Sequence, residues 1–132
     1  MLNLQNETID RIWRSLKRGD TYTTPDILRG VAFTISLIEH DRIHILPQNL
    51  SIHRNAFVAT VEYLKQNEHT PGKRCEIRSN NDRIKAGPLC QTSRKENNNI
   101  RCINYIIPIL NKFGVVDCDG NRPNTVWLME QI

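Results

Sequence analysis

The sequence has no long hydrophobic run. Its longest apolar stretch, residues 103–110, is interrupted by Asn104, Tyr105 and Pro108. A helix that crosses a bilayer needs about 20 apolar residues, so this stretch is far too short. The first residues also lack the basic start and the apolar run of a secretion signal. We therefore expect a cytoplasmic protein that has no membrane partner.

Cysteine is scarce, and no two of the four cysteines are close enough to form a C-x-x-C motif. That spacing excludes the usual zinc knuckle and the thiol redox motif. In a reducing cytosol we expect free thiols at Cys75, Cys90, Cys102 and Cys118, buried as small hydrophobic side chains. The alternative is a metal site that joins His69 and Cys75 to Cys90, but nothing in the spacing calls for it. The sequence predicts no cofactor and no metal.

Catalytic motifs are missing as well. The sequence has no H-E-x-x-H, no Ser-His-Asp order and no glycine-rich phosphate loop. Acid and imidazole side chains that an enzyme could use do occur, at Glu39, His40, Asp41, His44 and His53. The first three are consecutive in an expected turn, where side chains diverge. The sequence predicts that the chain is not an enzyme, although it could be the recognition part of a larger nuclease or restriction system.

What the sequence does have is an uneven distribution of charge, with a net charge of +4. Residues 1–72 carry eight basic and eight acidic side chains, whereas residues 73–112 carry nine basic side chains against Glu76, Asp82 and Glu96. A basic block on an otherwise neutral chain is typical of a protein with a polyanionic partner. An ordinary solvated surface is the alternative interpretation.

Hydrophobic periodicity predicts an N-terminal module of a helix and a β-hairpin over residues 1–54. Apolar residues recur at helical spacing over residues 6–18. The Thr-Pro-Asp sequence at 24–26 is a second helix start, for a short helix. Apolar and polar residues alternate over residues 31–46, which predicts two strands joined by a turn, and residues 50–53 are a candidate third strand.

The rest of the chain, residues 55–132, shows a different order of elements. We expect helix, helix, turn, helix and hairpin, over residues 55–66, 88–96, 97–99, 100–113 and 115–129. Pro88 stands at the first position of the second helix, and Gly114 ends the third. Residues 75–77 are a candidate short strand within an irregular polar segment.

This order of elements resembles the winged helix-turn-helix domains that bind DNA. The resemblance covers residues 55–129 and lies in element order and turn residues. It implies an α+β fold, in which the N-terminal helix-plus-hairpin module packs on a winged helix as one unit. It also implies double-stranded DNA as the partner.

The third helix, residues 100–113, would read the DNA. At about 100° per residue its polar side chains share one sector that contains no acid, and apolar side chains fill the rest. Arginine suits guanine, asparagine suits adenine and lysine suits phosphate, and a phosphate would also be attracted to the start of the helix. With Arg122 on the hairpin turn, the expected DNA-binding residues are Arg94, Lys95, Asn98, Asn99, Arg101, Asn104, Tyr105, Asn111, Lys112 and Arg122.

Two further residues shape this hypothesis. Pro108 lies inside the third helix and predicts a bend, or a helix in two pieces, because it removes a hydrogen bond to Asn104. Arg122 on a rigid turn suits a narrow minor groove, although a tight turn by itself also selects such residues.

The function expected from this pattern is sequence-selective binding of double-stranded DNA. The chain would be a small transcription regulator, or an accessory protein of a mobile element or restriction system. The alternative is a protein–protein interaction module that uses the winged helix as a docking surface, with a second copy or another protein as partner.

Overall fold

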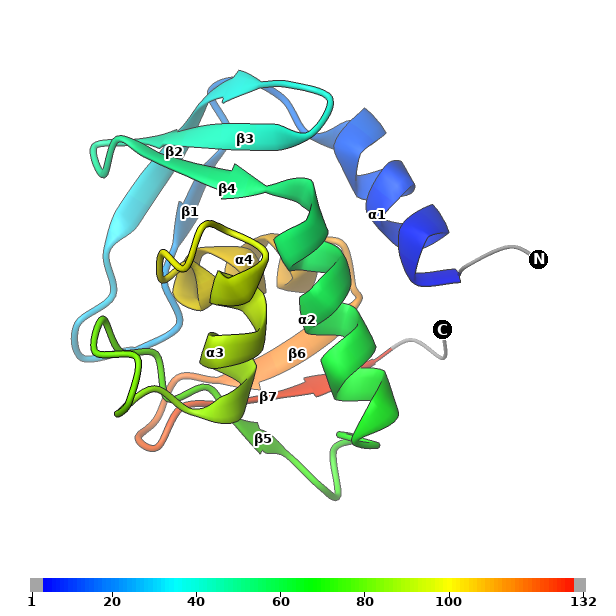
Figure 1. Cartoon of the computed structure of the whole chain (residues 1–132), viewed down its shortest axis with the longest axis vertical. Coiled ribbons are helices and arrows are strands. Elements are labelled where there is room, and N and C mark those ends of the chain that lie inside the picture. Colours follow the sequence, from blue (N-terminus) through cyan, green and yellow to red (C-terminus); the bar gives the residue numbers. More distant parts are fainter. Residues whose placement is uncertain (1–3, 130–132) are drawn as a thin grey trace.

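Two antiparallel sheets and the helices around them form the part of the chain that the structure describes, residues 4–129 of a computed structural model (Figure 1). The helices are α1 (Leu4–Ser15), α2 (Arg54–Gln66), α3 (Pro88–Lys95) and α4 (Ile103–Lys112). The strands are β1 (Thr21–Thr23), β2 (Ala32–Ile38), β3 (Arg42–Leu46), β4 (Leu50–His53), β5 (Cys75–Glu76), β6 (Val116–Asp119) and β7 (Thr125–Leu128). The expected α+β class is confirmed. None of the described helices is long and apolar enough to cross a membrane.

The first sheet has the strand order β1-β2-β3-β4, with each strand antiparallel to its neighbour. Its inner face buries alternate apolar residues, including Phe33, Ile35 and Ile43, which is the period expected of a half-buried strand. Helix α1 buries Ile9 and Ile12 beside them. The strands expected at residues 31–46 and 50–53 are present. Strand β1 was not expected, because three residues are too few to show an alternating pattern.

The expected short helix after Thr24 is wrong, because side chains close this segment as a loop instead. The Asp26 carboxylate accepts the backbone N–H of Leu28 at 3.1 Å, and the Thr24 hydroxyl accepts that of Val31 at 2.8 Å. Such side-chain bonds compete with helical hydrogen bonds. The segment becomes an extended loop between β1 and β2, and it carries Arg29.

The second sheet has the order β5-β7-β6, so the short strand β5 pairs with the last strand of the chain. Helices α2, α3 and α4 and the β6–β7 hairpin match the expected order. Helix α4 begins at Ile103, three residues later than expected, and it runs through Pro108 to Lys112 without a break in the helix. The residue before the helix, Cys102, has φ −146° and ψ −6°, which is outside the helical region, so the helix cannot start before Ile103. The left-handed Asn98 and Asn99, with φ of 54° and 60°, lie in the expected turn.

The two sheets share one continuous hydrophobic core, which joins residues from both halves of the chain. Helix α4 lies within it: Ile106, Ile107 and Leu110 have no exposed surface. The Tyr105 ring meets Phe33 of β2 edge-on, with 5.2 Å between ring centroids. The expectation that the N-terminal module packs closely on the rest of the chain therefore agrees with the structure.

Candidate nucleic-acid interface

The expected reading face of α4 is covered at its centre, at Tyr105, by the N-terminal sheet. Tyr105 is buried against Phe33 and retains 9% of its surface. The Lys112 ammonium group lies over the Tyr22 ring, 5.3 Å from its centroid. The expectation of one open polar face along the whole helix is therefore wrong. Within the sector free of acids, Tyr105 packs against β2 and the exposed Lys112 lies over an aromatic ring of β1.

Asn111, at the other end of α4, is tied to the fold. Its amide donates to the backbone oxygen of Val116 at 3.0 Å and more weakly to the Asp117 carboxylate at 3.4 Å. These bonds join the last turn of the helix to β6. Asn111 therefore has a structural role in place of the expected contact with a base.

Arg94 has a structural role as well. Its side chain is buried, and the guanidinium group donates to the backbone oxygens of Asn80, Asn81 and Asn99 at 2.9 to 3.3 Å. The expectation that Arg94 contacts DNA is wrong, because its donors are occupied inside the protein. It holds the loop before α3 against the turn between α3 and α4.

Arg122 on the β6–β7 turn is paired rather than free. Its Nη2 and Nε atoms donate to one Asp26 carboxylate oxygen at 2.8 and 3.1 Å. The hydrogen bond from Arg122 is the main reason why the pKa of Asp26 lies below its usual value. The role expected for Arg122, a free positive side chain that enters a minor groove, is therefore contradicted.

The hairpin turn also docks on the β1–β2 loop through its backbone. The N–H of Ile27 donates to the oxygen of Gly120 at 3.1 Å. A Cβ atom on Gly120 would lie 2.3 Å from the backbone oxygen of Pro25, so this approach requires glycine. The turn and the loop therefore form one surface.

The other expected residues lie near the start of α4. Lys95 is exposed at the end of α3, Asn98 and Asn99 are exposed on the turn between α3 and α4, and Arg101 is half-buried just before α4 begins. Asn104 follows in the first turn of the helix. The structure therefore keeps the N-terminal end of α4 accessible, while the rest of the expected face is packed or tied to the fold.

A cavity of about 440 Å³ opens at this end of α4. We call it the arginine cavity. It is bounded by the β1–β2 loop, the segment after β5, the start of α4 and the β6–β7 turn. The residues that line it are Thr24, Pro25, Asp26, Arg29, Val31, Ile77, Arg78, Ser79, Arg101, Asn104, Tyr105, Arg122, Pro123 and Asn124.

Positive charge dominates the arginine cavity. Four arginines line it, and its one acidic residue, Asp26, is already paired with Arg122. Among the described residues, the guanidinium groups of Arg29, Arg78 and Arg101 have no hydrogen bond and no ion pair. Arg29 is near enough to Asp26 to contribute to the lowered pKa of that carboxyl group, but none of the three is hydrogen-bonded to it. The cavity therefore offers guanidinium donors without a hydrogen-bond partner to an anion.

Two polar atoms in the lining also lack partners. The Ser79 hydroxyl and the Asn104 amide oxygen are buried and make no hydrogen bond within the described part of the chain. A buried polar group without a partner costs about 1–3 kcal/mol. Helix α4 also begins without a side-chain cap, since Cys102 makes no capping hydrogen bond. These groups are suited to a polar ligand in the cavity.

A second cavity, of about 520 Å³, lies next to the α3–α4 turn and is lined by Arg83, Pro88, Gln91, Thr92, Arg94, Lys95 and Asn99. Arg94 lines this cavity and binds both the loop before α3 and the turn after it. Figure 1 shows the β1–β2 loop, the loop before α3 and the β6–β7 turn on the same side of the molecule, at the lower left. We call this surface the basic face and define it by Arg29, Arg78, Arg83, Lys95, Arg101 and Arg122.

The sequence did not reveal Arg29, Arg78 or Ser79 as site residues. Arg29 lies in the half of the chain with no net charge, in a segment expected to be a helix. Arg78 and Ser79 lie in an irregular segment without periodicity. We find no sequence signal that connects them with Arg101, because only the packing of the N-terminal loop on the hairpin turn brings these segments together.

A chain of three polar side chains on the first sheet was also missed. The His44 ring contacts the Ser51 hydroxyl at 2.9 Å through Nδ1 and the Glu39 carboxylate through Nε2. The sequence placed Glu39 in a turn with diverging neighbours and did not pair it with His44 across the hairpin. The cavities described here are lined by other residues, so these three side chains do not by themselves define an active site.

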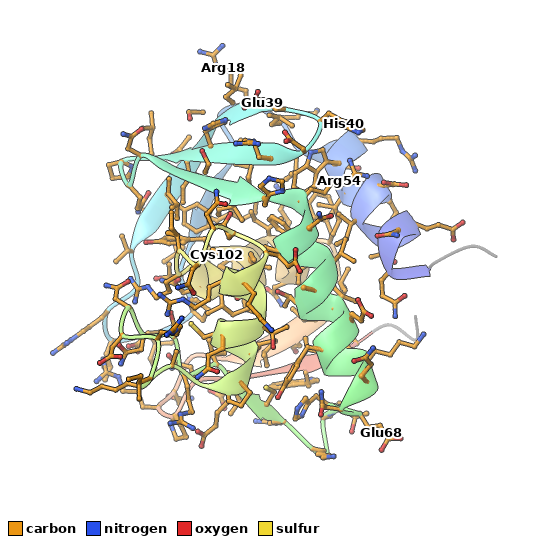
Figure 2. All side chains as sticks on the ribbon, in the orientation of Figure 1. Arg18, Glu39, His40, Arg54, Glu68 and Cys102 are labelled. Carbon is orange, nitrogen blue, oxygen red and sulfur yellow. The ribbon has the colours of Figure 1, made fainter. Side chains whose placement is uncertain are left out.

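The four cysteines are free thiols, and Cys102 lies in the interior (Figure 2). Among residues 4–129, no group of three or more His, Cys, Asp or Glu side chains is arranged to hold a metal ion. Burial raises the pKa of the Cys75 thiol to about 11 and that of Cys102 to about 12. The thiolate, which is the reactive form, is therefore rare in both residues at neutral pH.

We expect Cys75 and Cys102 to resist alkylation in the folded protein. Iodoacetamide at pH 8, followed by mass spectrometry of peptides, measures the modification of each thiol. In denaturant, where burial no longer raises the pKa, both should react at the ordinary rate of a cysteine. Rapid modification of Cys102 without denaturant would contradict the burial described here.

No family model, no curated protein and no solved structure matches this chain. The interpretation of the site therefore depends on its own geometry. Its main features are three unpaired guanidinium groups, two unpartnered polar atoms and the uncapped start of a helix.

Proposed function

We propose that the chain binds double-stranded DNA through the basic face. The observation that carries this proposal is the gathering of unpaired basic side chains around the accessible end of α4. The acids around this face are Asp26, which is paired with Arg122, Asp82, which accepts the backbone N–H of Ile84 in its own loop, and Glu96 at the end of α3. Basic side chains around a helix end provide the phosphate contacts that position a protein on a duplex.

We further propose that residues 55–129 are a winged helix-turn-helix domain. In this assignment α3 and α4 form the helix-turn-helix, and the β6–β7 hairpin is the wing. The element order α2, β5, α3, α4, β6, β7 supports the assignment. The pairing of β5 with β7 supports it too, because it completes a small sheet beside the three helices.

Because the middle of α4 is covered at Tyr105, DNA would contact the helix at its N-terminal end. In helix-turn-helix proteins the N-terminal residues of the recognition helix contact the base edges, and this is the part of α4 that remains accessible. Arg101 would read a guanine and Asn104 an adenine. Arg29, Arg78, Arg83 and Lys95 of the basic face would contact phosphates on either side of these two bases.

The test is a fluorescence anisotropy titration of a duplex selected from a random-sequence pool. Replacing Arg101 or Asn104 with alanine is expected to weaken binding to the selected duplex by about 1–3 kcal/mol each. Binding to unrelated duplexes should change less. Arg18→Ala is the matched control, because Figure 2 shows Arg18 at the top of the molecule, away from the basic face.

Salt provides the second readout. Affinity should fall steeply with salt concentration, because each neutralised phosphate releases counterions. If the affinity does not depend on salt, or if both variants bind every duplex as the wild type does, the proposal is wrong. Self-association in a sedimentation experiment, together with no DNA binding, would favour the docking-module alternative.

A change at Asp26 should strengthen DNA binding. Asp26→Asn removes the one acid of the arginine cavity and leaves the Arg122 guanidinium free for a phosphate. We expect tighter binding to all duplexes, and a slope of log affinity against log salt that is steeper by about one. Glu68→Gln, which changes the net charge equally at an exposed residue away from the basic face (Figure 2), should have a much smaller effect. Equal effects of the two variants would exclude a specific role for the Asp26–Arg122 pair.

A further inference from the structure

The arginine cavity concentrates positive charge in one place. Arg29, Arg78 and Arg101 come from three separate segments and line one concave space. A phosphodiester within a duplex carries one charge and is joined to a sugar on both sides, so it stays on the outer surface. A terminal phosphate carries about 1.5 to 2 negative charges at pH 7 and is joined on one side only, so it can enter end-first.

The backbone holds two of these arginines in place. Arg78 packs over Gly87, where an added Cβ would lie 2.6 Å from the Arg78 Cβ, and its backbone oxygen accepts the Gly87 N–H at 3.0 Å. Arg29 belongs to the loop that Thr24 closes through the N–H of Val31. Because these segments are fixed without a ligand, binding would cost little ordering of the backbone.

The inner part of the cavity offers neutral donors. The Ser79 hydroxyl has no partner and can donate to an anion, whereas the unpartnered amide oxygen of Asn104, in the first turn of α4, can accept from a hydroxyl group of a ligand. The uncapped start of α4 adds backbone N–H groups and the positive end of the helix dipole, both of which favour an anion. A phosphate bound there would receive hydrogen bonds from guanidinium groups, a hydroxyl and a helix end.

We propose that the arginine cavity binds a phosphomonoester. Its volume of about 440 Å³ lies in the usual range of small-molecule sites and leaves room for a sugar and a base beside the phosphate. The source is the terminal phosphate of a nucleic-acid strand or a free mononucleotide. The choice of a nucleic-acid end rests on the proposed function, whereas binding of the phosphate itself does not.

The experiment compares the affinity of the full chain for duplexes of one sequence that end in a 5′-phosphate, a 3′-phosphate or hydroxyl groups only. One phosphorylated duplex should bind about tenfold more tightly than the hydroxyl duplex, as new charge-assisted hydrogen bonds would produce. Arg29→Ala, Arg78→Ala and Arg101→Ala should each reduce this preference. Arg83→Ala, a basic residue outside the arginine cavity, should weaken binding to all duplexes and leave the preference unchanged.

Calorimetric titrations with adenosine monophosphate and with inorganic phosphate separate the two sources. If the mononucleotide binds about as tightly as the phosphorylated duplex and displaces it, free nucleotide is the ligand. If the phosphorylated duplex binds far more tightly than the mononucleotide, a strand end is the ligand. Equal binding of all duplexes, together with no binding of either small anion, would overturn the inference and leave the proposed function standing. Binding of the mononucleotide without binding of any duplex would support the cavity and refute the proposed function.

Discussion

Replacing Leu110 with alanine is expected to lower the free energy of unfolding by about 2–5 kcal/mol, the usual range for a core leucine. Leu110 has no exposed surface and lies in the helix that the two sheets share. A small domain has only about 5–15 kcal/mol in total, so the variant should unfold at much lower denaturant concentration. Chemical denaturation followed by circular dichroism measures the change.

Lys112→Ala is the control for Leu110, two residues further along the same helix. Lys112 is exposed, and its ammonium group lies over the Tyr22 ring, a contact that contributes about 0.5–1 kcal/mol at exposed sites. We therefore expect a small loss of stability. If Leu110→Ala denatures at the same midpoint as the wild type, the orientation of α4 is wrong, and the assignments at its N-terminal end are wrong with it.

Arg94→Met is expected to lower the free energy of unfolding by about 3 kcal/mol. The change keeps an apolar stem of similar length but removes the guanidinium group that serves three backbone oxygens. Hydrogen bonds from charged groups contribute about 1.5–3 kcal/mol each, and buried acceptors left without a donor add a further cost. Denaturant unfolding measures the loss.

Limited proteolysis gives a second readout for Arg94. Without its guanidinium group, the loop before α3 loses its attachment to the α3–α4 turn, so cleavage within residues 78–87 should become faster. Lys95→Met is the matched control, because Lys95 is the next residue and is exposed. Equal stability of the two variants would show that Arg94 is a surface residue, as the sequence suggested. It would then not hold the loop before α3 against the α3–α4 turn.

The secondary structure was predictable because its signals are local. Pro88 at the first position of α3, Gly114 after α4 and the alternation within β2 and β3 act over a few residues each. The errors also have local causes. Asp26 accepts the N–H of Leu28 and Thr24 that of Val31, which favours a loop over a helix, and the non-helical backbone of Cys102 delays the start of α4.

The site was only partly predictable, because its exposure is a tertiary property. A helical projection shows that Tyr105 and Lys112 share a sector, but it does not show that Phe33 packs on Tyr105 or that Tyr22 lies under Lys112. The same projection treats Arg94 as a surface cation, since nothing local reveals the three carbonyl groups that it binds.

The sequence by itself determined the class of fold, the order of the elements and the basic character of residues 73–112, because periodicity, turn residues and charge are properties of short segments. Only the tertiary structure decided which basic side chains remain unpaired. Packing brought Asp26 to Arg122 and carbonyl oxygens to Arg94, and it placed Arg29 and Arg78 beside Arg101. The physical reason is that an ion pair or a cavity depends on distances between segments far apart in the chain, and the core that α4 shares with both sheets sets those distances.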